Sequence, residues 1–356
     1  MSKSGFSRAG FLPARVIHLH PSRFCNLACQ HCYSASGPHV RGELPAAGIL
    51  SALAVLKEEG YEVLSLSGGE PLLYSGFETV VRGAAALGLR INLITNGAPV
   101  GGRLLDLIAS HVNLIAISLD GAPGTHAEMR GDGNAFARAD RAMDRLTATG
   151  VRYGLSYCIS RESLADMPWA VEFAREKGAA LVHFHPFSAM GRGRAVASRL
   201  SLSETDKARA YIIASLLETD DTPGVQIDLA PVDAVRTRRD DYAALILDDA
   251  RHTPLSDLIN PLVIDETGRV LPFSYGMSPR FDIGHIGAEL AMAVSCYKLN
   301  NWRSLRALLD TAFAQLDTHS ERFLDWFWYL IETSYTLPES DAMRASTASR
   351  AATTTP

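Results

Sequence analysis

Residues 16–33 have the sequence VIHLHPSRFCNLACQHCY. The first five, Val16–His20, predict a short β-strand that leads directly into a loop. In that loop Cys25, Cys29 and Cys32 have the spacing Cys-x3-Cys-x2-Cys, although the whole 356-residue chain contains only five cysteines. Three thiols on one short loop can converge on a single metal centre, so this stretch predicts both the start of the fold and a metal site.

The three cysteines form an odd set of ligands. A structural zinc site has four protein ligands, and no nearby His or Asp clearly completes one: His31 lies inside the motif and His20 lies on the predicted strand. A disulfide would leave one thiol over. A cubane iron–sulfur cluster has four irons, so three thiolates would leave one iron open to another molecule. A structural zinc knuckle remains the alternative hypothesis.

Length and composition indicate a globular protein. The 356 residues suffice for one large barrel-type domain with an appendage, and 47% hydrophobic and 21% charged residues are ordinary values. The formal net charge of −5 predicts no general affinity for nucleic acid. No apolar run approaches the roughly 18 residues of a membrane span, and Met1–Arg8 lacks the apolar core of a secretory signal. Because Cys158 and Cys296 lie far apart in sequence, we expect no disulfide framework and a reducing, cytoplasmic location.

Predicted strands and helices alternate along residues 14–220, with short connections. This order is typical of a parallel sheet covered by helices, curled into a partial or full barrel whose site lies at the carboxyl ends of the strands. The predicted strands are Val16–His20, Glu62–Ser67, Arg90–Thr95, Leu114–Leu119, Arg152–Ile159 and Leu181–His185, and the predicted helices are Leu44–Glu59, Phe77–Leu87, Arg103–Ser110, Phe136–Thr149, Leu164–Lys177 and Ser203–Glu218.

Polar motifs follow the first four of these strands, so we expect them to meet on one rim. After the cysteine loop come Ser67-Gly68-Gly69-Glu70-Pro71, then Thr95-Asn96-Gly97, then Ser118 and Asp120. Glycines let the backbone approach a ligand closely, and a carboxylate suits an ammonium group. Alone, Gly68-Gly69-Glu70-Pro71 also fits an ordinary strand-to-helix turn.

With Tyr33 directly after the third cysteine and Gly68-Gly69-Glu70 after the second strand, residues 14–200 resemble the radical S-adenosylmethionine (radical SAM) enzymes. The resemblance implies an α/β fold, a partial (β/α)6 TIM-like barrel. It also implies that Cys25, Cys29 and Cys32 bind one [4Fe-4S] cluster whose open iron takes S-adenosylmethionine. Reductive cleavage of that cofactor would give a 5′-deoxyadenosyl radical that takes hydrogen from a substrate. The cofactors would supply the radical chemistry, and the protein would position the reacting groups.

The resemblance also implies which residues touch S-adenosylmethionine. Ser118 and Asp120 share one side of their strand by its two-residue period and match contacts to the ribose or the methionine carboxylate. Arg130 matches an arginine that neutralises that carboxylate; a solvated loop arginine is the alternative. Asn96 is an implied contact, and stabilisation of a turn is the alternative. The implied cofactor set is Tyr33, Gly68, Gly69, Glu70, Asn96, Ser118, Asp120 and Arg130.

Candidate catalytic residues lie on the fifth and sixth predicted strands. His183 and His185 share one face and, if that face points into the barrel, they contact substrate or carry protons; a merely polar lining is the alternative. Cys158 is a candidate hydrogen donor, although a free cysteine is usually a small buried hydrophobe. The stretch Gly191-Arg192-Gly193-Arg194 resembles a segment that receives a carboxylate, or is a plain basic loop.

The C-terminal third predicts a β-hairpin, Leu262–Asp265 and Arg269–Phe273, joined by Glu266-Thr267-Gly268, and then helical stretches at Ser304–Leu316 and Phe323–Ile331. It resembles the SPASM/Twitch-like cap of peptide-modifying radical SAM enzymes, but Phe273 stands where a cluster-binding cysteine is expected. We therefore expect a barrel at 14–220, a degenerate cap with C-terminal helices at 221–338 and a disordered tail at 339–356. Phe273, Tyr275 and Met277 would fill space or touch substrate.

The degenerate cap favours a ribosomally synthesised peptide as substrate, modified by side-chain cross-linking or in another way. A small molecule such as a sugar, nucleoside or cofactor precursor is the alternative. It is supported by the short stretch before the predicted barrel, which we expect to be too short for a leader-peptide-binding domain. A non-enzymatic iron–sulfur or zinc protein would leave Gly68-Gly69-Glu70 and the Ser118/Asp120 pair unexplained. We expect an external electron donor such as flavodoxin or ferredoxin as partner, and neither nucleic acid nor membrane.

Overall fold

The computed structural model describes residues 14–219 and 223–338. Within them the main feature is a ten-stranded sheet in the order β11-β10-β9-β1-β2-β3-β4-β5-β6-β7. Neighbouring strands from β9 to β7 are parallel, whereas β10 and β11 pair antiparallel. The strands are β1 Val16–Leu19, β2 Val63–Leu66, β3 Arg90–Thr95, β4 Leu114–Ser118, β5 Tyr153–Ile159, β6 Leu181–Pro186, β7 Gly224–Ile227, β9 Leu262–Ile264, β10 Arg269–Pro272 and β11 Gly284–His285.

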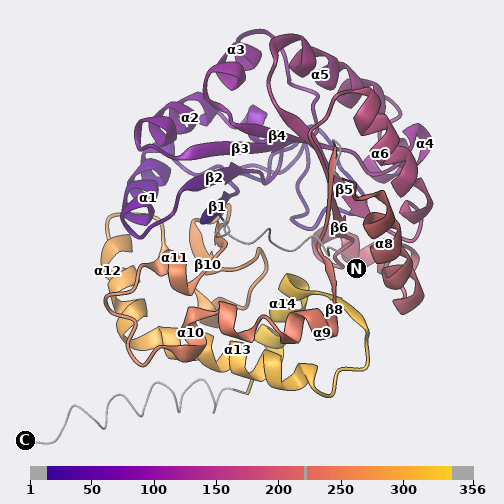
Figure 1. Cartoon of the computed structure of the whole chain (residues 1–356). Coiled ribbons are helices and arrows are strands. Elements are labelled where there is room, and N and C mark those ends of the chain that lie inside the picture. The colour runs from indigo at the N-terminus through magenta and orange to yellow at the C-terminus, as the bar shows by residue number, and fades with distance from the viewer. Residues whose placement is uncertain (1–13, 220–222, 339–356) are drawn as a thin grey trace, which may run out of the picture.

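Helices cover the outer face of the curved sheet (Figure 1), which confirms the predicted partial barrel. Its edge strands β11 and β7 do not pair, so the barrel is open. The periodic residues Ile49, Leu53 and Leu56 of α1 are all buried, and Ser203 caps α8 through a capping box as expected. These helices are α1 Ala46–Glu58, α2 Phe77–Ala86, α3 Gly102–His111, α4 Pro123–Arg130, α5 Ala135–Thr149, α6 Met167–Glu176, α7 Ala197–Leu200 and α8 Glu204–Leu217.

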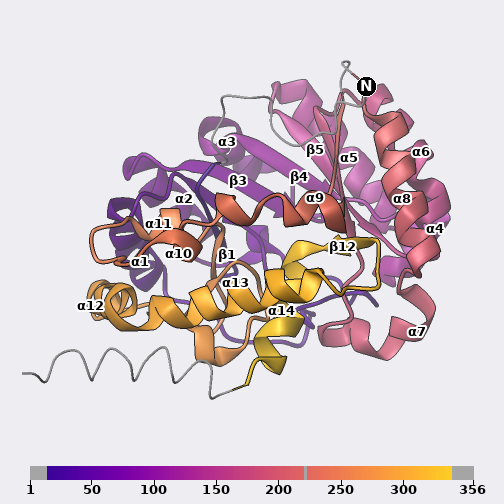
Figure 2. The same cartoon turned by 60° about the horizontal axis from the view of Figure 1, so that its bottom comes forward.

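The C-terminal elements lie across the open side of the arc (Figures 1 and 2). The predicted hairpin is present as β9 and β10, but β9 also pairs in parallel with β1, so the hairpin extends the barrel sheet. The remaining elements are β8 Leu229–Pro231, α9 Val232–Arg236, α10 Ala243–Ile246, α11 Leu255–Leu258, α12 Leu290–Cys296, α13 Trp302–Leu316, β12 Phe323–Asp325 and α14 Trp326–Thr336.

Two local predictions were wrong or incomplete. Helix α4 was not predicted, because its eight residues PGTHAEMR are too short and too polar to show an apolar period. The stretch Phe323–Ile331 was predicted as helical throughout, but its first three residues form β12, which pairs with β8. That pairing joins segments about ninety residues apart, so a local pattern cannot reveal it. The predictions for Met1–Arg8 and for 339–356 lie outside the described residues, as does the proposed boundary at 220/221.

Phe273 fills the core beneath the C-terminal elements. It is 2% exposed, and its φ of +63° lies in the left-handed region that a non-glycine residue rarely adopts. Its ring contacts Tyr242, whose ring in turn contacts Phe313 and Trp326. Buried aromatic packing therefore holds Phe273 in a conformation that costs free energy. Met277 is also buried. Of the two expectations, filling space or touching substrate, the burial of both residues supports the first.

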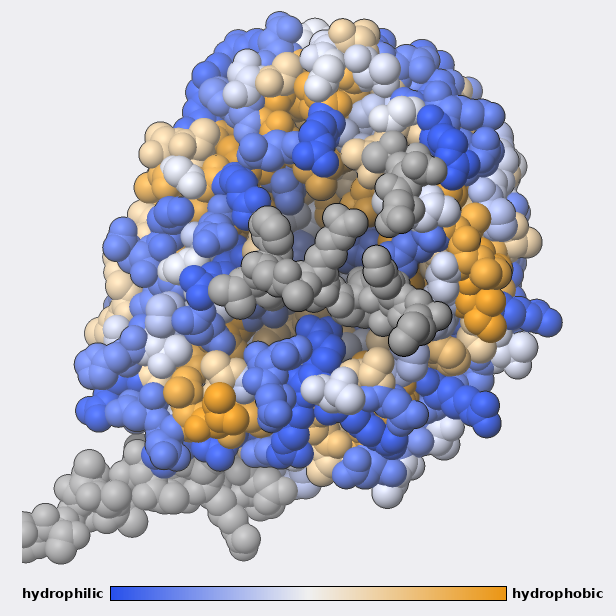
Figure 3. Space-filling view, in the orientation of Figure 1, coloured by the Kyte–Doolittle hydropathy of each residue, from blue (hydrophilic) through white to orange (hydrophobic). Residues whose placement is uncertain are grey.

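No helix in residues 14–219 and 223–338 is long and apolar enough to cross a membrane. On the face seen in Figure 3, hydrophobic and hydrophilic residues are interspersed.

We predict that Phe273→Ala lowers the free energy of unfolding by about 3–5 kcal/mol, because the lost ring leaves a cavity among Tyr242 and its neighbours. Urea unfolding followed by circular dichroism measures the change. The matched control is Tyr335→Ala, since Tyr335 is 61% exposed and its loss should change the value by less than about 0.5 kcal/mol. Equal effects of the two substitutions would contradict a space-filling role for Phe273.

Candidate functional site

The loop after β1 brings the three cysteines together. Cys25 and Cys29 are buried and Cys32 is partly exposed. Each sulfur accepts a hydrogen bond from a nitrogen: Leu27 N–H to Cys25 at 3.5 Å, Ser36 N–H to Cys32 at 3.3 Å, and the Arg130 guanidinium to Cys29 at 3.8 Å. Hydrogen bonds and positive charge directed at sulfur stabilise thiolates, so the loop is built to hold three thiolate ligands.

The three cysteines are not arranged around a single metal ion. In the described part of the chain, no three His, Cys, Asp or Glu side chains converge as the ligands of one metal ion would. In a cubane each thiolate binds a different iron, so the sulfurs need not converge on one point. Burial, followed by the nearby Glu70 charge, raises the pKa of Cys25 to about 12 despite the bond from Leu27, and a bound cationic centre would lower it.

Gly68 and Gly69 dock the exit of β2 onto the cysteine loop. A Cβ on Gly69 would lie 2.1 Å from the Phe24 carbonyl oxygen, and Gly68 has a φ of +103°. The Gly69 N–H donates to the Ser22 carbonyl at 2.9 Å, and the Glu70 N–H donates to the Phe24 carbonyl at 2.9 Å. Only glycine fits such a close backbone approach, so both residues shape the loop that holds the cysteines.

The buried Glu70 carboxylate joins the exits of β2 and β3. It accepts hydrogen bonds from the Thr95 hydroxyl at 2.7 Å, the Leu72 N–H at 3.1 Å and the Asn96 N–H at 2.9 Å. Burial raises the pKa of Glu70 to about 7 against the effect of these bonds. Asn96 does stabilise its turn, because its side-chain oxygen accepts from the Ala98 N–H, and its amide also reaches the cysteine loop at Asn26.

Asp120, at the end of β4, is 1% exposed and forms a buried ion pair with Arg130, at 2.6 Å from Nε to Oδ2. The imidazole of His31, inside the cysteine motif, lies 3.5 Å from the same oxygen. Burial alone would raise the pKa of Asp120, but Arg130, His31 and His126 together hold it well below its usual range. Arg130 is therefore a buried partner of Asp120 and Cys29, and the alternative of a solvated loop arginine is wrong.

We predict that Arg130→Met lowers the free energy of unfolding of the metal-free protein by about 3–5 kcal/mol at pH 7, because it leaves the Asp120 carboxylate buried without a cation. Without Arg130, burial is the largest effect on Asp120 and raises its pKa, so the variant's carboxyl takes up a proton as the pH falls from 7 toward 4, whereas the wild-type pair stays ionised. The deficit of the variant should therefore shrink between pH 7 and pH 4, as urea unfolding measures.

Arg82→Met is the control for this prediction, since Arg82 forms an exposed pair with Glu78 and should cost about 0.5 kcal/mol or less. A deficit for Arg130→Met that stays constant with pH would show that lost packing, and not the ion pair, causes it.

Further along the rim, polar side chains line the inside of the barrel. Ser118 is partly exposed and lies in register with Ser156 on β5. The Ser156 hydroxyl lies 3.1 Å from Nε2 of His185, and the rings of His185 and His183 are 6.0 Å apart. The structure therefore places both predicted histidines and Ser118 along one polar row inside the barrel.

Cys158 is buried and packs against Met129, Phe187 and Leu200. Burial, and then the charge of Asp120, raises the pKa of its thiol well above the ordinary value. These surroundings match the interpretation of Cys158 as a small buried hydrophobe. Cys296, the last residue of α12, is exposed.

Arg192 and Tyr275 hold the cysteine loop from outside. The Arg192 guanidinium donates to the carbonyl oxygens of Cys29 and Ser36, both at 2.7 Å, so the Gly-Arg segment clamps the loop. Tyr275 stacks on His20 with ring centroids 4.9 Å apart and meets Tyr33 edge-on at 5.2 Å. Sequence patterns gave no sign of these contacts, because they join segments more than a hundred residues apart.

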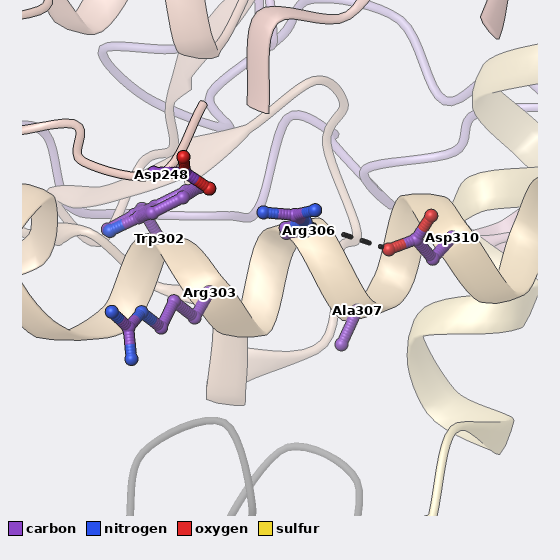
Figure 4. Close-up of a pocket in the computed structure, with 6 residues that line it drawn as sticks. All are labelled: Asp248, Trp302, Arg303, Arg306, Ala307 and Asp310. Atoms are coloured by element: carbon purple, nitrogen blue, oxygen red, sulfur yellow. Dashed lines mark ion pairs between the residues drawn. The ribbon is translucent and has the colours of Figure 1, made fainter. Parts of the chain in front are cut away.

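A separate pocket lies on α13 (Figure 4), and its lining contains none of the predicted site residues. The lining residues are Asp248, Trp302, Arg303, Arg306, Ala307 and Asp310.

Two of the curated proteins that the chain resembles act on different classes of substrate by name. The chain is 28% identical over 220 residues to the pre-heme d1 synthase of Dinoroseobacter shibae, covering 61% of this chain and 54% of the relative. It is 29% identical over 203 residues to the PqqA peptide cyclase of Xanthomonas campestris pv. campestris, covering 54% of each. The chain thus spans about half the length of the curated relatives that it matches.

Among solved structures, native anSMEcpe with bound AdoMet and a peptide superposes with a TM-score of 0.62 at 15% identity, over 94% of this chain and 100% of that one. This likeness shows the fold. Residues 19–174 match the model of the radical SAM superfamily, whose members use a [4Fe-4S] cluster and S-adenosylmethionine. The matched segment begins at the end of β1 and includes the cysteine loop and the Asp120–Arg130 pair. The chain therefore contains a radical SAM domain and is similar to the enzymes of the radical SAM superfamily.

Proposed function

We propose that this chain is a radical SAM enzyme in which Cys25, Cys29 and Cys32 bind its one [4Fe-4S] cluster, with S-adenosylmethionine on the open iron. The observation that supports this most strongly is the position of three nitrogen-bonded sulfurs on one loop, beside the exits of β2, β3 and β4. Of the other two cysteines, Cys158 is buried among apolar side chains and Cys296 is exposed, which supports a single cluster.

When bound, the cluster and S-adenosylmethionine supply a 5′-deoxyadenosyl radical that can take a hydrogen atom from a substrate. The chain's own residues hold and surround that chemistry. Arg192 and the Gly68-Gly69 turn fix the cysteine loop, and Arg130 keeps a positive charge beside Cys29. Tyr33, Glu70, Asn96, Ser118 and Asp120 would hold S-adenosylmethionine on the rim, and the His183–His185 row lines the space inside the barrel where a substrate would lie.

The proposed substrate is a ribosomally synthesised peptide, modified at a side chain or at an α-carbon. The similarity to the PqqA peptide cyclase supports this choice, as does the hairpin that resembles a peptide-maturase cap without its cysteine. The similarity to the pre-heme d1 synthase, over a slightly longer stretch, supports a small-molecule substrate of the tetrapyrrole class as second candidate. An external electron donor of the flavodoxin or ferredoxin class would reduce the cluster in the cytoplasm.

After anaerobic reconstitution we expect about four irons and four sulfides per chain. Addition of dithionite and S-adenosylmethionine should then yield 5′-deoxyadenosine, measured by liquid chromatography. Bound zinc, or no cleavage after full reconstitution, would contradict the proposed function, and about eight irons per chain would contradict the single cluster.

Cys25→Ser should lose more than half of the reconstituted iron and its charge-transfer absorbance, because one of three buried ligands is gone. Cys296→Ser is the matched control and should keep the wild-type iron content, because Cys296 is exposed on α12. Equal iron contents of the two variants would show that Cys25 is not a cluster ligand.

The substrate class is tested by incubating the reduced enzyme with the peptide encoded beside its gene and, separately, with an iron porphyrin. A mass change of the peptide alone supports the peptide proposal. A change of the porphyrin alone supports the second candidate and overturns the first.

A further inference from the structure

Five ionisable side chains meet inside the barrel, away from the cysteines. They come from β1, β6, the β7–β8 connection and the start of α14, so distant parts of the chain contribute to one cluster. The residues are His18, His183, His185, Asp228 and Asp325. Sequence patterns had marked only His183 and His185.

The closest contact in this cluster is the pair His183–Asp228, at 2.8 Å from Nε2 to Oδ1. The backbone fixes both partners, because β6 and β7 pair in parallel and the Asp228 N–H donates to the Phe184 carbonyl at 3.0 Å. A short contact between two residues on fixed strands sets the ring orientation of His183. The Asp228 carboxylate accepts a hydrogen bond from the Nε2–H group of His183. In the neutral imidazole the proton therefore lies on Nε2, and Nδ1 has the free lone pair.

Asp325 adds a second carboxylate beside this pair. Strand β12 pairs with β8 and places Asp325 opposite Leu229, the residue after Asp228. One oxygen of Asp325 caps α14 by accepting from the N–H groups of Phe327 and Trp328, at 3.0 and 3.1 Å. Burial, followed by the Asp228 charge, raises the pKa of Asp325 to about 7. Asp325 is therefore only partly ionised near pH 7, and its effect on His183 is smaller than that of Asp228.

Nδ1 of His183 has no hydrogen-bond partner among residues 14–219 and 223–338, and the side chain is 33% exposed. The other imidazoles in the cluster differ. Burial, followed by the charge of His183, lowers the pKa of both His18 and His185 to about 4, so both are neutral at pH 7. Burial also opposes a charge on His183, but Asp228 and Asp325 outweigh it and raise its pKa.

We propose that His183 is the acid–base residue of the barrel interior and that Asp228 is the positioning residue that orients it. This deepens the proposed function and rests on it. A proton leaves an O–H or N–H bond of the substrate for Nδ1 of His183, and the electron pair of that bond stays on the substrate oxygen or nitrogen. Asp228 balances the charge that the imidazolium gains, and the reverse transfer returns the proton. His185, whose Nε2 bonds to Ser156, and the buried Cys158 do not take this role.

The direct test is the titration of imidazole resonances by NMR in the full-length, 15N-histidine-labelled protein without cofactors, with His183→Gln to assign the signal. We expect the neutral His183 ring to have its proton on Nε2. Asp228→Asn should lower the titration midpoint of His183 by about one pH unit or more, because a neighbouring negative charge is lost while the shape of the side chain stays.

Asp325→Asn provides a second variant and should lower the same midpoint by less, because Asp325 makes no direct contact with the ring. Circular dichroism checks that both variants fold. A midpoint that neither substitution moves, or a neutral ring with its proton on Nδ1, would overturn the assignment.

The same variants are compared in activity between pH 6 and pH 9, with the peptide encoded beside the gene as probe. In the wild type, the rate of product formation should change with pH as the NMR titration of His183 does. In Asp228→Asn, the midpoint of the activity–pH profile should shift by as much as the NMR midpoint of His183. Product with an unchanged profile would overturn the acid–base role while leaving radical SAM chemistry intact. A wild type that forms no 5′-deoxyadenosine would instead overturn the proposed function, and the NMR titration would still decide whether Asp228 sets the state of His183.

Discussion

The site depends on one close backbone approach, in which the Gly68-Gly69 turn lies directly against the cysteine loop. At Gly69 no side chain fits, because a Cβ would overlap the Phe24 carbonyl oxygen at 2.1 Å. Two backbone hydrogen bonds fasten the turn to the loop, and the next residue, Glu70, binds the exit of β3. The first three strand exits are thus fixed relative to each other before any cofactor binds, which is the preorganisation that an open metal centre needs.

The buried charged groups form two sets, one on the rim and one inside the barrel. On the rim, Asp120 and Arg130 neutralise each other, and Arg130 also reaches Cys29, so this pair supports the proposed cluster and not the substrate. Inside the barrel, Asp228 and Asp325 both raise the pKa of His183, whose imidazole has one nitrogen without a partner among the described residues. A buried pair whose charges balance gives structure, whereas an unbalanced group with a free nitrogen is suited to exchange protons.

The sequence predicted what depends on local spacing. The cysteine motif, the glycine turn, the alternation of strands and helices and the β9–β10 hairpin all lie within short stretches, and all were found. The pairing of Asp120 with Arg130 was missed because both were assigned to the cofactor, and the short polar α4 that turns Arg130 back onto β4 has no apolar period. Asp228 and Asp325 were missed because the contact of β8 with β12 is non-local. Local patterns specify elements, whereas tertiary packing decides which polar groups become partners.

The central claim is that three thiolates hold a cluster with one iron left open. The most direct measurement is the electron paramagnetic resonance spectrum of the reconstituted, dithionite-reduced protein, recorded before and after addition of S-adenosylmethionine. We predict a reduced-cluster signal whose g-values shift when S-adenosylmethionine binds, since the open iron gains new ligands. A cluster signal that S-adenosylmethionine leaves unchanged would contradict the account.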